Sequence, residues 1–94
     1  MDQTEARQVL TEILAQYRQL SYSDLLARND QPVTVERVGP SGTNYQIEMQ
    51  VFVDDSHRQT LRVLGAIDDF SARWTSSPMC DDFIIAPDGI LVGE

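Results

Sequence analysis

The hydrophobic period of this chain changes once, close to Pro32, and the change restricts the folds that the sequence can adopt. Upstream, apolar residues recur every three or four positions and form one stripe along a helix: Ala6, Val9, Leu10, Ile13, Leu14, Tyr17 and Leu20. Downstream, apolar and polar residues alternate, as they do in strands with one buried face. Two apolar surfaces of different period have only each other to cover them, so the sequence predicts a helix packed on a sheet.

Capping residues set the limits of the helical region. Asp2 or Thr4 can cap the first helix, and Glu5 stands three residues after Asp2, as in an aspartate variant of the capping box. The segment 21–24, Ser-Tyr-Ser-Asp, is a second cap and predicts a short second helix. Asn29 is expected to end that helix in the left-handed conformation, because asparagine tolerates a positive φ better than most residues do.

Three strands follow, each bounded by turn residues. The alternation predicts strands over 33–38, 45–53 and 61–67, and Gly-Pro-Ser-Gly at 39–42 supplies the turn between the first two. Gly65 interrupts the third apolar run. A glycine there is otherwise a loss of strand propensity, so we expect a bend or the close approach of another backbone, and room for the side chain of Met49 on the neighbouring strand to lie across the sheet.

A simple hairpin between the second and third strands sets their register. It pairs Val53 with Leu61, Phe52 with Arg62, Gln50 with Leu64, and Glu48 with Ala66. Phe52 and Leu64 are then large apolar residues on an otherwise mostly polar strand face. We expect the C-terminal segment or a second subunit to cover them, and a homodimer is one prediction.

The C-terminal part predicts two further elements. These are a short strand over 70–74 and a terminal hairpin, 83–86 with 90–92, closed by Pro-Asp-Gly. The sequence therefore predicts a single α+β domain over residues 1–94. In it, an N-terminal amphipathic helix and a short second helix pack on one face of a four- to five-stranded antiparallel sheet.

Charge is the most unusual global feature. The chain carries 15 acidic residues against 7 arginines and no lysine, a formal net charge of −8. This charge repels nucleic-acid phosphates and anionic lipids, so neither is expected as a partner, whereas a basic protein is electrostatically favoured. The N-terminus lacks the basic start and apolar run of a signal peptide, and no stretch approaches the roughly 20 apolar residues that span a bilayer. We expect a cytoplasmic protein, and the single Cys80 fits a reducing compartment.

Three acidic doublets are the most distinctive local feature: Asp54-Asp55, Asp68-Asp69 and Asp81-Asp82. Their oxygens suit calcium or magnesium, but no doublet has the alternating Asp-x-Asp-x-Asp-Gly loop of an EF-hand. Aspartate is also common at strand ends, where it accepts hydrogen bonds from backbone amides, so no metal or cofactor is predicted. If residues 70–75 run back along the sheet, the doublets at 54–55 and 81–82 share one rim, beside His57.

Catalytic residues are few. His57 is the only histidine, and no nucleophile and orienting acid are expected to converge on it. Cys80 precedes two aspartates, whose negative charge disfavours the reactive thiolate. Trp74 is expected to pack in the core or at an interface, with the wall of a groove as the alternative. We therefore predict that the protein is not an enzyme.

Several segments resemble a family of small uncharacterised bacterial proteins. They are LRVLGAIDD at 61–69, DDFIIAPDG at 81–89 and VGE at 92–94, preceded by VGPSGTNYQIE at 38–48. The likeness covers the chain from about residue 20 onward. It implies a single domain, and it implies no activity, cofactor or catalytic residue.

Three classes of function stay open. The leading prediction is a non-catalytic protein-interaction module, which includes an immunity- or antitoxin-like protein that binds a basic partner. The alternative is a domain that binds a small ligand or a divalent cation on a concave sheet lined by Trp74 and Tyr45. An enzyme is the third class. The residues predicted to bind a partner are Asp54, Asp55, Asp81, Asp82, His57, Phe52, Leu64 and Trp74.

Overall fold

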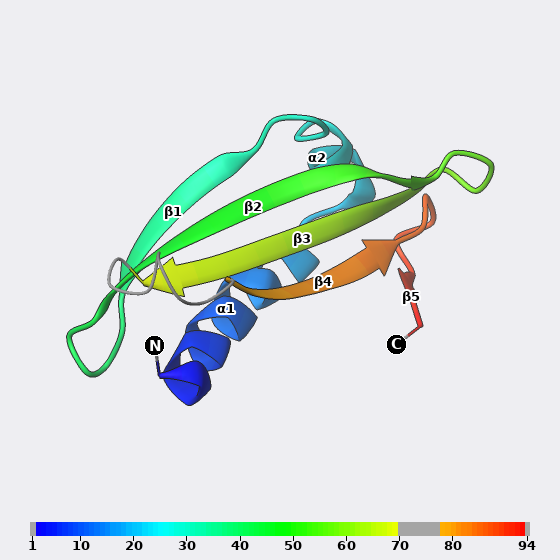
Figure 1. Ribbon diagram of the computed structural model, residues 1–94. Coiled ribbons are helices and arrows are strands. Elements are labelled where there is room, and N and C mark those ends of the chain that lie inside the picture. Colours follow the sequence, from blue (N-terminus) through cyan, green and yellow to red (C-terminus); the bar gives the residue numbers. More distant parts are fainter. Residues whose placement is uncertain (1, 70–77, 94) are drawn as a thin grey trace.

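Two helices precede a five-stranded antiparallel sheet in the computed structural model, which describes residues 2–69 and 78–93 (Figure 1). The elements are α1 (Gln3–Arg18), α2 (Tyr22–Leu26), β1 (Val33–Val38), β2 (Asn44–Asp55), β3 (Thr60–Asp69), β4 (Met79–Ile85) and β5 (Leu91–Val92). The strands lie in the sheet in the order of the sequence, from β1 to β5. The predicted α+β class, two helices on one face of an antiparallel sheet, is confirmed.

Helix α1 packs on the half of the sheet that β3 and β4 form (Figure 1). Asp2 caps it, because its carboxylate accepts hydrogen bonds from the backbone N–H groups of Thr4 and Glu5 at 3.0 and 3.1 Å. The predicted apolar stripe faces the sheet: Ala6, Leu10, Ile13 and Leu14 are at most 3% exposed. Tyr17 is only partly buried at the margin of this core.

The strands meet in the predicted register. β2 and β3 pair Val53 with Leu61, Phe52 with Arg62, Gln50 with Leu64, and Glu48 with Ala66. Nine apolar side chains of β2, β3 and β4 on the side of α1 form the core and are 5% exposed or less: Tyr45, Ile47, Met49, Val51, Leu61, Val63, Ile67, Phe83 and Ile85. Because successive side chains of a strand point to opposite faces, the residues between them lie on the other side of the sheet.

Gly65 lies on the side of β3 that faces α1, opposite Met49. A Cβ atom built there would be 2.7 Å from Leu10 Cδ1 and 3.0 Å from Met49 Sδ, which is too close for an unshifted neighbour. The expected approach of another backbone was wrong, because side chains make the close contact; the expected room for Met49 is confirmed. The glycine leaves the space that Leu10 and Met49 fill.

Helix α2 begins at the predicted cap, where Ser21 Oγ accepts a hydrogen bond from the Asp24 N–H at 3.1 Å. The prediction for the turn after it was wrong by one residue. Asp30, with φ of 59°, takes the left-handed conformation expected of Asn29. Asn29 instead forms a bridge with Val51, and the Asp30 N–H donates to the Val51 carbonyl at 3.0 Å. This contact with β2 moves the reversal to Asp30, because aspartate accepts that conformation as asparagine does.

Strand β4 pairs directly with β3 and begins earlier than predicted. Asp81 lies opposite Gly65 and Asp82 opposite Leu64, so the acidic doublet belongs to the strand. The strand predicted over 70–74 lies outside the described residues. The predicted terminal hairpin is confirmed as β4 and β5, and Gly89, with φ of 86°, stands in its turn.

Candidate functional site

The sheet has one face on which no described helix packs, and we call it the outer face (Figure 1). Strand alternation places on it Gln46, Glu48, Gln50 and Phe52 of β2, Arg62, Leu64, Ala66 and Asp68 of β3, and Cys80, Asp82 and Ile84 of β4. Phe52 and Leu64, two of the residues predicted to bind a partner, are therefore together on this face.

Four apolar side chains form a patch in the middle of the outer face: Phe52, Leu64, Ala66 and Ile84. Phe52 and Ile84 lie on either side of Arg62 in one row across the strands, and Leu64 and Ala66 continue along β3. Each of the four is only partly buried. Apolar side chains left partly exposed on one face are typical of a surface that a partner covers.

Arg62 joins two of the acidic doublets on this face. Its Nε and Nη2 atoms lie 3.0 and 2.9 Å from Asp54 Oδ1, and its Nη1 contacts Asp82 Oδ2. The hydrogen bond with Asp54 raises the pKa of Arg62 above its ordinary value, and the nearby charges of Asp54 and Asp82 act in the same direction. The sequence did not reveal this role of Arg62, because the three positions meet only through the pairing of three strands.

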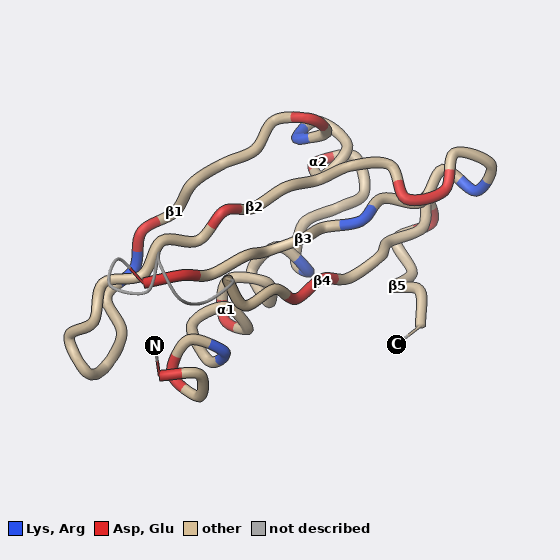
Figure 2. Tube along the Cα trace, viewed as in Figure 1, with Lys and Arg blue, Asp and Glu red and all other residues tan. Residues whose placement is uncertain are grey.

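Two further carboxylates, those of Glu48 and Asp68, lie on the outer face beyond Leu64. They line an open hollow of about 210 Å³ together with Gln46, Ala66 and Pro78. Within the described part of the chain no arginine forms an ion pair with either carboxylate, and Gln50 Nε2 donates to Glu48 Oε1 at 2.7 Å. Figure 2 shows acidic segments on β1, β2, β3 and β4. The apolar patch therefore has a negative border.

The structure assembles the predicted acidic rim only in part, because Asp54 and Asp82 meet at Arg62 whereas Asp55 and Asp81 do not join them there. Asp81 and Asp82 lie within β4 rather than at a loop, because β4 pairs directly with β3. Of the two, only Asp82 reaches the outer face, since Asp81 alternates to the side of α1. Asp55 caps the β2–β3 loop, where its Oδ1 accepts a hydrogen bond from the His57 N–H at 2.9 Å. His57 is exposed in that loop, and Trp74 lies outside the described residues.

Two observations on the described residues bear on the predicted alternative, a ligand or cation site. Across residues 2–69 and 78–93, no three His, Cys, Asp or Glu side chains lie close enough to hold a metal ion. Tyr45, which was expected to line an open concave site, is 0% exposed. That expectation was wrong, because the side of the sheet that carries Tyr45 is the side that forms the core.

A second polar cluster ties α1 to the β1–β2 turn. Glu5 accepts hydrogen bonds from the Ser41 N–H and Oγ at 2.9 and 2.7 Å, and from the Tyr45 hydroxyl at 2.7 Å. The hydrogen bond from Tyr45 lowers the pKa of Glu5, while burial and this same contact raise the pKa of Tyr45 to about 12. Gly39 permits the packing, because a Cβ atom there would be 2.6 Å from Glu5 Oε1.

Glu5 was predicted only as part of a helix cap. Its partners Ser41 and Tyr45 lie 36 and 40 residues away, so no local pattern could reveal them. The turn at 39–42 was predicted correctly, and Gly42, with φ of 88°, donates its N–H to the Gly39 carbonyl at 2.9 Å. The cluster is thus a structural contact between the start of α1 and the first hairpin.

Comparison with known proteins identifies no relative: no protein-family model matches the chain, and neither a curated protein nor a solved structure matches it. The resemblance to a family of small bacterial proteins therefore stays a prediction. Neither of the described helices combines the length and the apolar composition needed to cross a membrane.

Proposed function

We propose that this protein is a non-catalytic interaction module that binds a basic protein partner through the outer face of its sheet. The observation that carries the proposal is the arrangement of that face. An apolar patch of Phe52, Leu64, Ala66 and Ile84 lies inside a border of carboxylates from Glu48, Asp54, Asp68 and Asp82. Protein interfaces combine an apolar centre with a polar margin in this way.

The charge of the border favours a partner with lysine or arginine side chains. The whole chain carries a net charge of −8, which attracts a basic protein from a distance and speeds the encounter. Glu48 and Asp68 line a hollow without an arginine paired to them in the described residues, so a cation of the partner fits there. Arg62 holds Asp54 and Asp82 in one position, and such ordering before binding lowers the entropic cost of association.

An immunity- or antitoxin-like role is the biological form of this proposal. In such a pair a small acidic protein covers a basic effector, and affinity depends on a broad negative surface with an apolar centre. The outer face provides a surface of this kind, and its breadth spans β2, β3 and β4.

The first test is affinity capture from cells that produce the protein, with the wild type and two variants of equal net charge as bait. Leu64→Arg adds a positive charge in the middle of the apolar patch, opposite Asp82. Thr11→Arg adds the same charge on the exposed side of α1. A basic partner should be retained by the wild type and by Thr11→Arg, and lost with Leu64→Arg.

The second test measures the purified partner by calorimetry at about 0.05 and about 0.3 M NaCl. The wild-type affinity should fall as salt rises, because screening weakens attraction between opposite charges. Leu64→Arg should weaken binding by at least about tenfold at either salt concentration, since it disrupts the centre of the interface. Equal affinity of the two arginine variants would overturn the proposal, because the outer face would then not be the binding site.

A further inference from the structure

Strand β1 forms one edge of the sheet, and its outward edge pairs with no described segment. The Gly39 N–H donates to the Thr43 carbonyl at 2.8 Å, which makes these two residues a hydrogen-bonded pair. Hydrogen-bonded and non-hydrogen-bonded pairs alternate along an antiparallel ladder. The backbone N–H and C=O groups of Thr34, Glu36 and Val38 therefore point away from β2 toward the open edge.

Natural sheets usually protect such an edge, and β1 has little protection. The strand contains no lysine, proline or glycine, and it pairs with β2 along its six residues without a register shift. One exposed side chain covers part of the edge, because Arg37 Nη1 donates to the Glu36 carbonyl at 3.0 Å. The other edge differs: β5 has two residues, and β4 carries Asp81 and Asp82. The charges of β4 are of one sign and repel a second copy of that edge, whereas β1 carries one charge of each sign, Glu36 and Arg37, so β1 is the edge that favours pairing.

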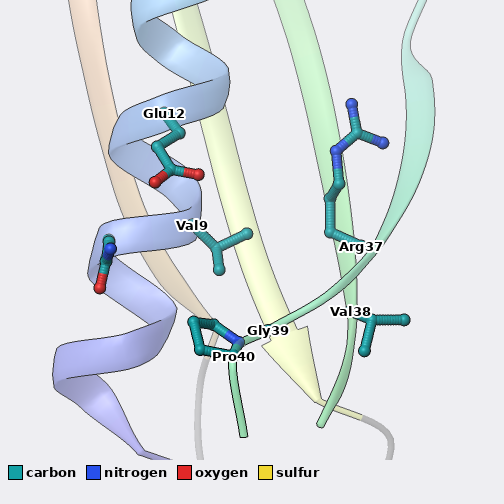
Figure 3. A pocket seen from close by; sticks show the side chains of 7 residues that line it. Val9, Glu12, Arg37, Val38, Gly39 and Pro40 are labelled. Carbon is teal, nitrogen blue, oxygen red and sulfur yellow. The ribbon is translucent and has the colours of Figure 1, made fainter. Parts of the chain in front are cut away.

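The side of β1 that faces α1 is also open. A hollow of about 300 Å³ lies between them, with Val9 and Glu12 of the helix on one wall and Arg37 and Val38 on the other (Figure 3). On this side Val33, which pairs with the core residue Met49, is 43% exposed, and Val38, which alternates to the outer side, is 67% exposed. A strand added beside β1 therefore finds both an unpaired backbone and partly uncovered apolar side chains.

We propose that a second copy of this chain pairs with β1 through its own β1, antiparallel, about a two-fold axis at Val35. In this register Thr34 lies opposite the partner's Glu36 in two equivalent pairs, and each pair makes two backbone hydrogen bonds. Val35 lies beside its counterpart at the axis. No like charges face each other, whereas the register centred on Glu36 sets two glutamates opposite each other, which is destabilising.

The unpaired backbone groups of β1 require another extended strand, and β1 of a second copy is such a strand. Alternating N–H and C=O groups are satisfied together only by another extended backbone, and β1 is rich in the β-branched residues that such strands prefer. The pairing joins the two sheets edge to edge, with both α1 helices on one side. Both outer faces then lie on the other side, so the dimer leaves the proposed binding face of each copy uncovered.

The strength of this association follows from its size and charge. Pairing of one short strand buries less than the roughly 1,600 Å² of a standard stable interface, so we expect a weak dimer that forms only at high protein concentration. Each copy carries a net charge of −8, so the copies repel one another and added salt strengthens the dimer. Binding of a basic partner has the opposite dependence on salt, which separates the two proposals.

Sedimentation velocity from about 10 to about 500 μM, at about 0.05 and about 0.5 M NaCl, tests the pairing with wild type, Glu36→Ala and Glu36→Pro. Alanine keeps the outward N–H of residue 36. Proline removes it but spares the bonds to β2, because that N–H points away from β2. We expect wild type and Glu36→Ala to dimerise more strongly as salt rises, and Glu36→Pro to stay monomeric with a melting temperature close to that of wild type.

Amide hydrogen exchange of the wild type provides a measurement that needs no variant. The Thr34 and Glu36 amides should exchange more slowly as the protein concentration rises, because they become hydrogen bonded in the dimer. A wild type that stays monomeric in high salt would overturn the proposal. A dimer that Glu36→Pro does not weaken and in which the Thr34 amide stays unprotected would also overturn it, since the interface would then lie elsewhere, for instance at Phe52 and Leu64.

Discussion

The two faces of the sheet consist of alternate residues of the same strands, yet they differ in how completely they are covered. Val63 and Ile67 on the side of α1 are 0% exposed, whereas Leu64 and Ala66 between them are only partly buried. One step along β3 therefore separates the core from a surface. The apolar content of a strand therefore does not measure its contribution to stability. The side of α1 stabilises the fold, and the apolar side chains of the outer face contribute less to it.

The largest expected contrast between the faces is in the free energy of unfolding. Ile13→Ala removes a side chain that is 3% exposed between α1 and the sheet, and should cost about 2–5 kcal/mol. Leu64→Ala on the outer face should cost less than about 1 kcal/mol, because water already reaches part of that side chain. Urea denaturation of both variants measures the two values. Equal losses would show that the outer face is a second core.

Valine substitutions at two adjacent positions of β3, Gly65 and Ala66, compare the two faces of the sheet directly. Gly65→Val places its Cβ within 2.7 Å of Leu10 Cδ1, so the overpacked core should lose about 1–3 kcal/mol. Ala66→Val points to the outer face, and its effect should stay within about 0.5 kcal/mol. Thermal and urea denaturation of the pair test this order. A tolerated valine at position 65 would mean that Leu10 and Met49 move aside at little cost.

The side of α1 also contains a titrating contact, between Glu5 and Tyr45. The pKa of Tyr45 is raised from 10.0 to about 12, so its stabilising effect is complete below pH 10 and is lost as pH rises toward about 12. The pKa of Glu5 is lowered from 4.5, so its effect is complete above pH 4.5 and is lost as pH falls through the lowered value. Between these pH limits the hydrogen bond of Tyr45 to Glu5 contributes fully to the stability of the fold.

Tyr45→Phe tests this contact, because phenylalanine keeps the ring and removes the hydroxyl that Glu5 accepts from. The wild type should be more stable than the variant by a constant amount from about pH 5 to about pH 9, and the difference should shrink above pH 10. Urea denaturation across this range gives both curves. A difference that stays constant up to pH 12 would show that folding does not raise the pKa of Tyr45.

The smallest effect on stability is expected from the carboxylates of the outer face. Glu48→Gln together with Asp68→Asn should change the free energy of unfolding by no more than about 0.5 kcal/mol, because Glu48 is exposed and an asparagine oxygen at the partly buried position 68 can still accept the hydrogen bond from the Asp69 N–H. The same variant should bind a basic partner more slowly and with a weaker dependence on salt. Glu12→Gln with Asp30→Asn removes the same charge outside the outer face and should leave the binding rate nearly unchanged. Equal slowing in both variants would assign the effect to net charge alone.

Most of the fold could be predicted because its determinants are local. Alternation and one loop length set the register of β2 and β3, and Ser21 and Gly42 mark a cap and a turn by their own chemistry. The left-handed conformation was predicted at Asn29 and is found at Asp30. The two residues have a similar preference for it, and the hydrogen bond of the Asp30 N–H to β2 decides between them.

The candidate site could be predicted only in part, because its members meet through the topology of the sheet. Phe52 and Leu64 share the outer face as predicted, since they belong to one hairpin. Asp81 and Asp82 were predicted at a rim and lie within β4. Their position depends on which segment pairs with β3, and local sequence does not determine that pairing. The ion pairs of Arg62 and the contacts of Glu5 could not be predicted either, because they join residues that only the tertiary structure brings together.

Methyl NMR tests the central claim most directly, because methyl groups project from both faces of the same strands. In a titration of the methyl-labelled protein with the captured basic partner, the signals of Leu64, Ala66 and Ile84 should shift or broaden. The signals of Ile47, Val63 and Ile67, which are 0% exposed on the side of α1, should move little. Perturbation confined to residues outside the outer face, with Leu64 and Ile84 unchanged at saturation, would contradict the account.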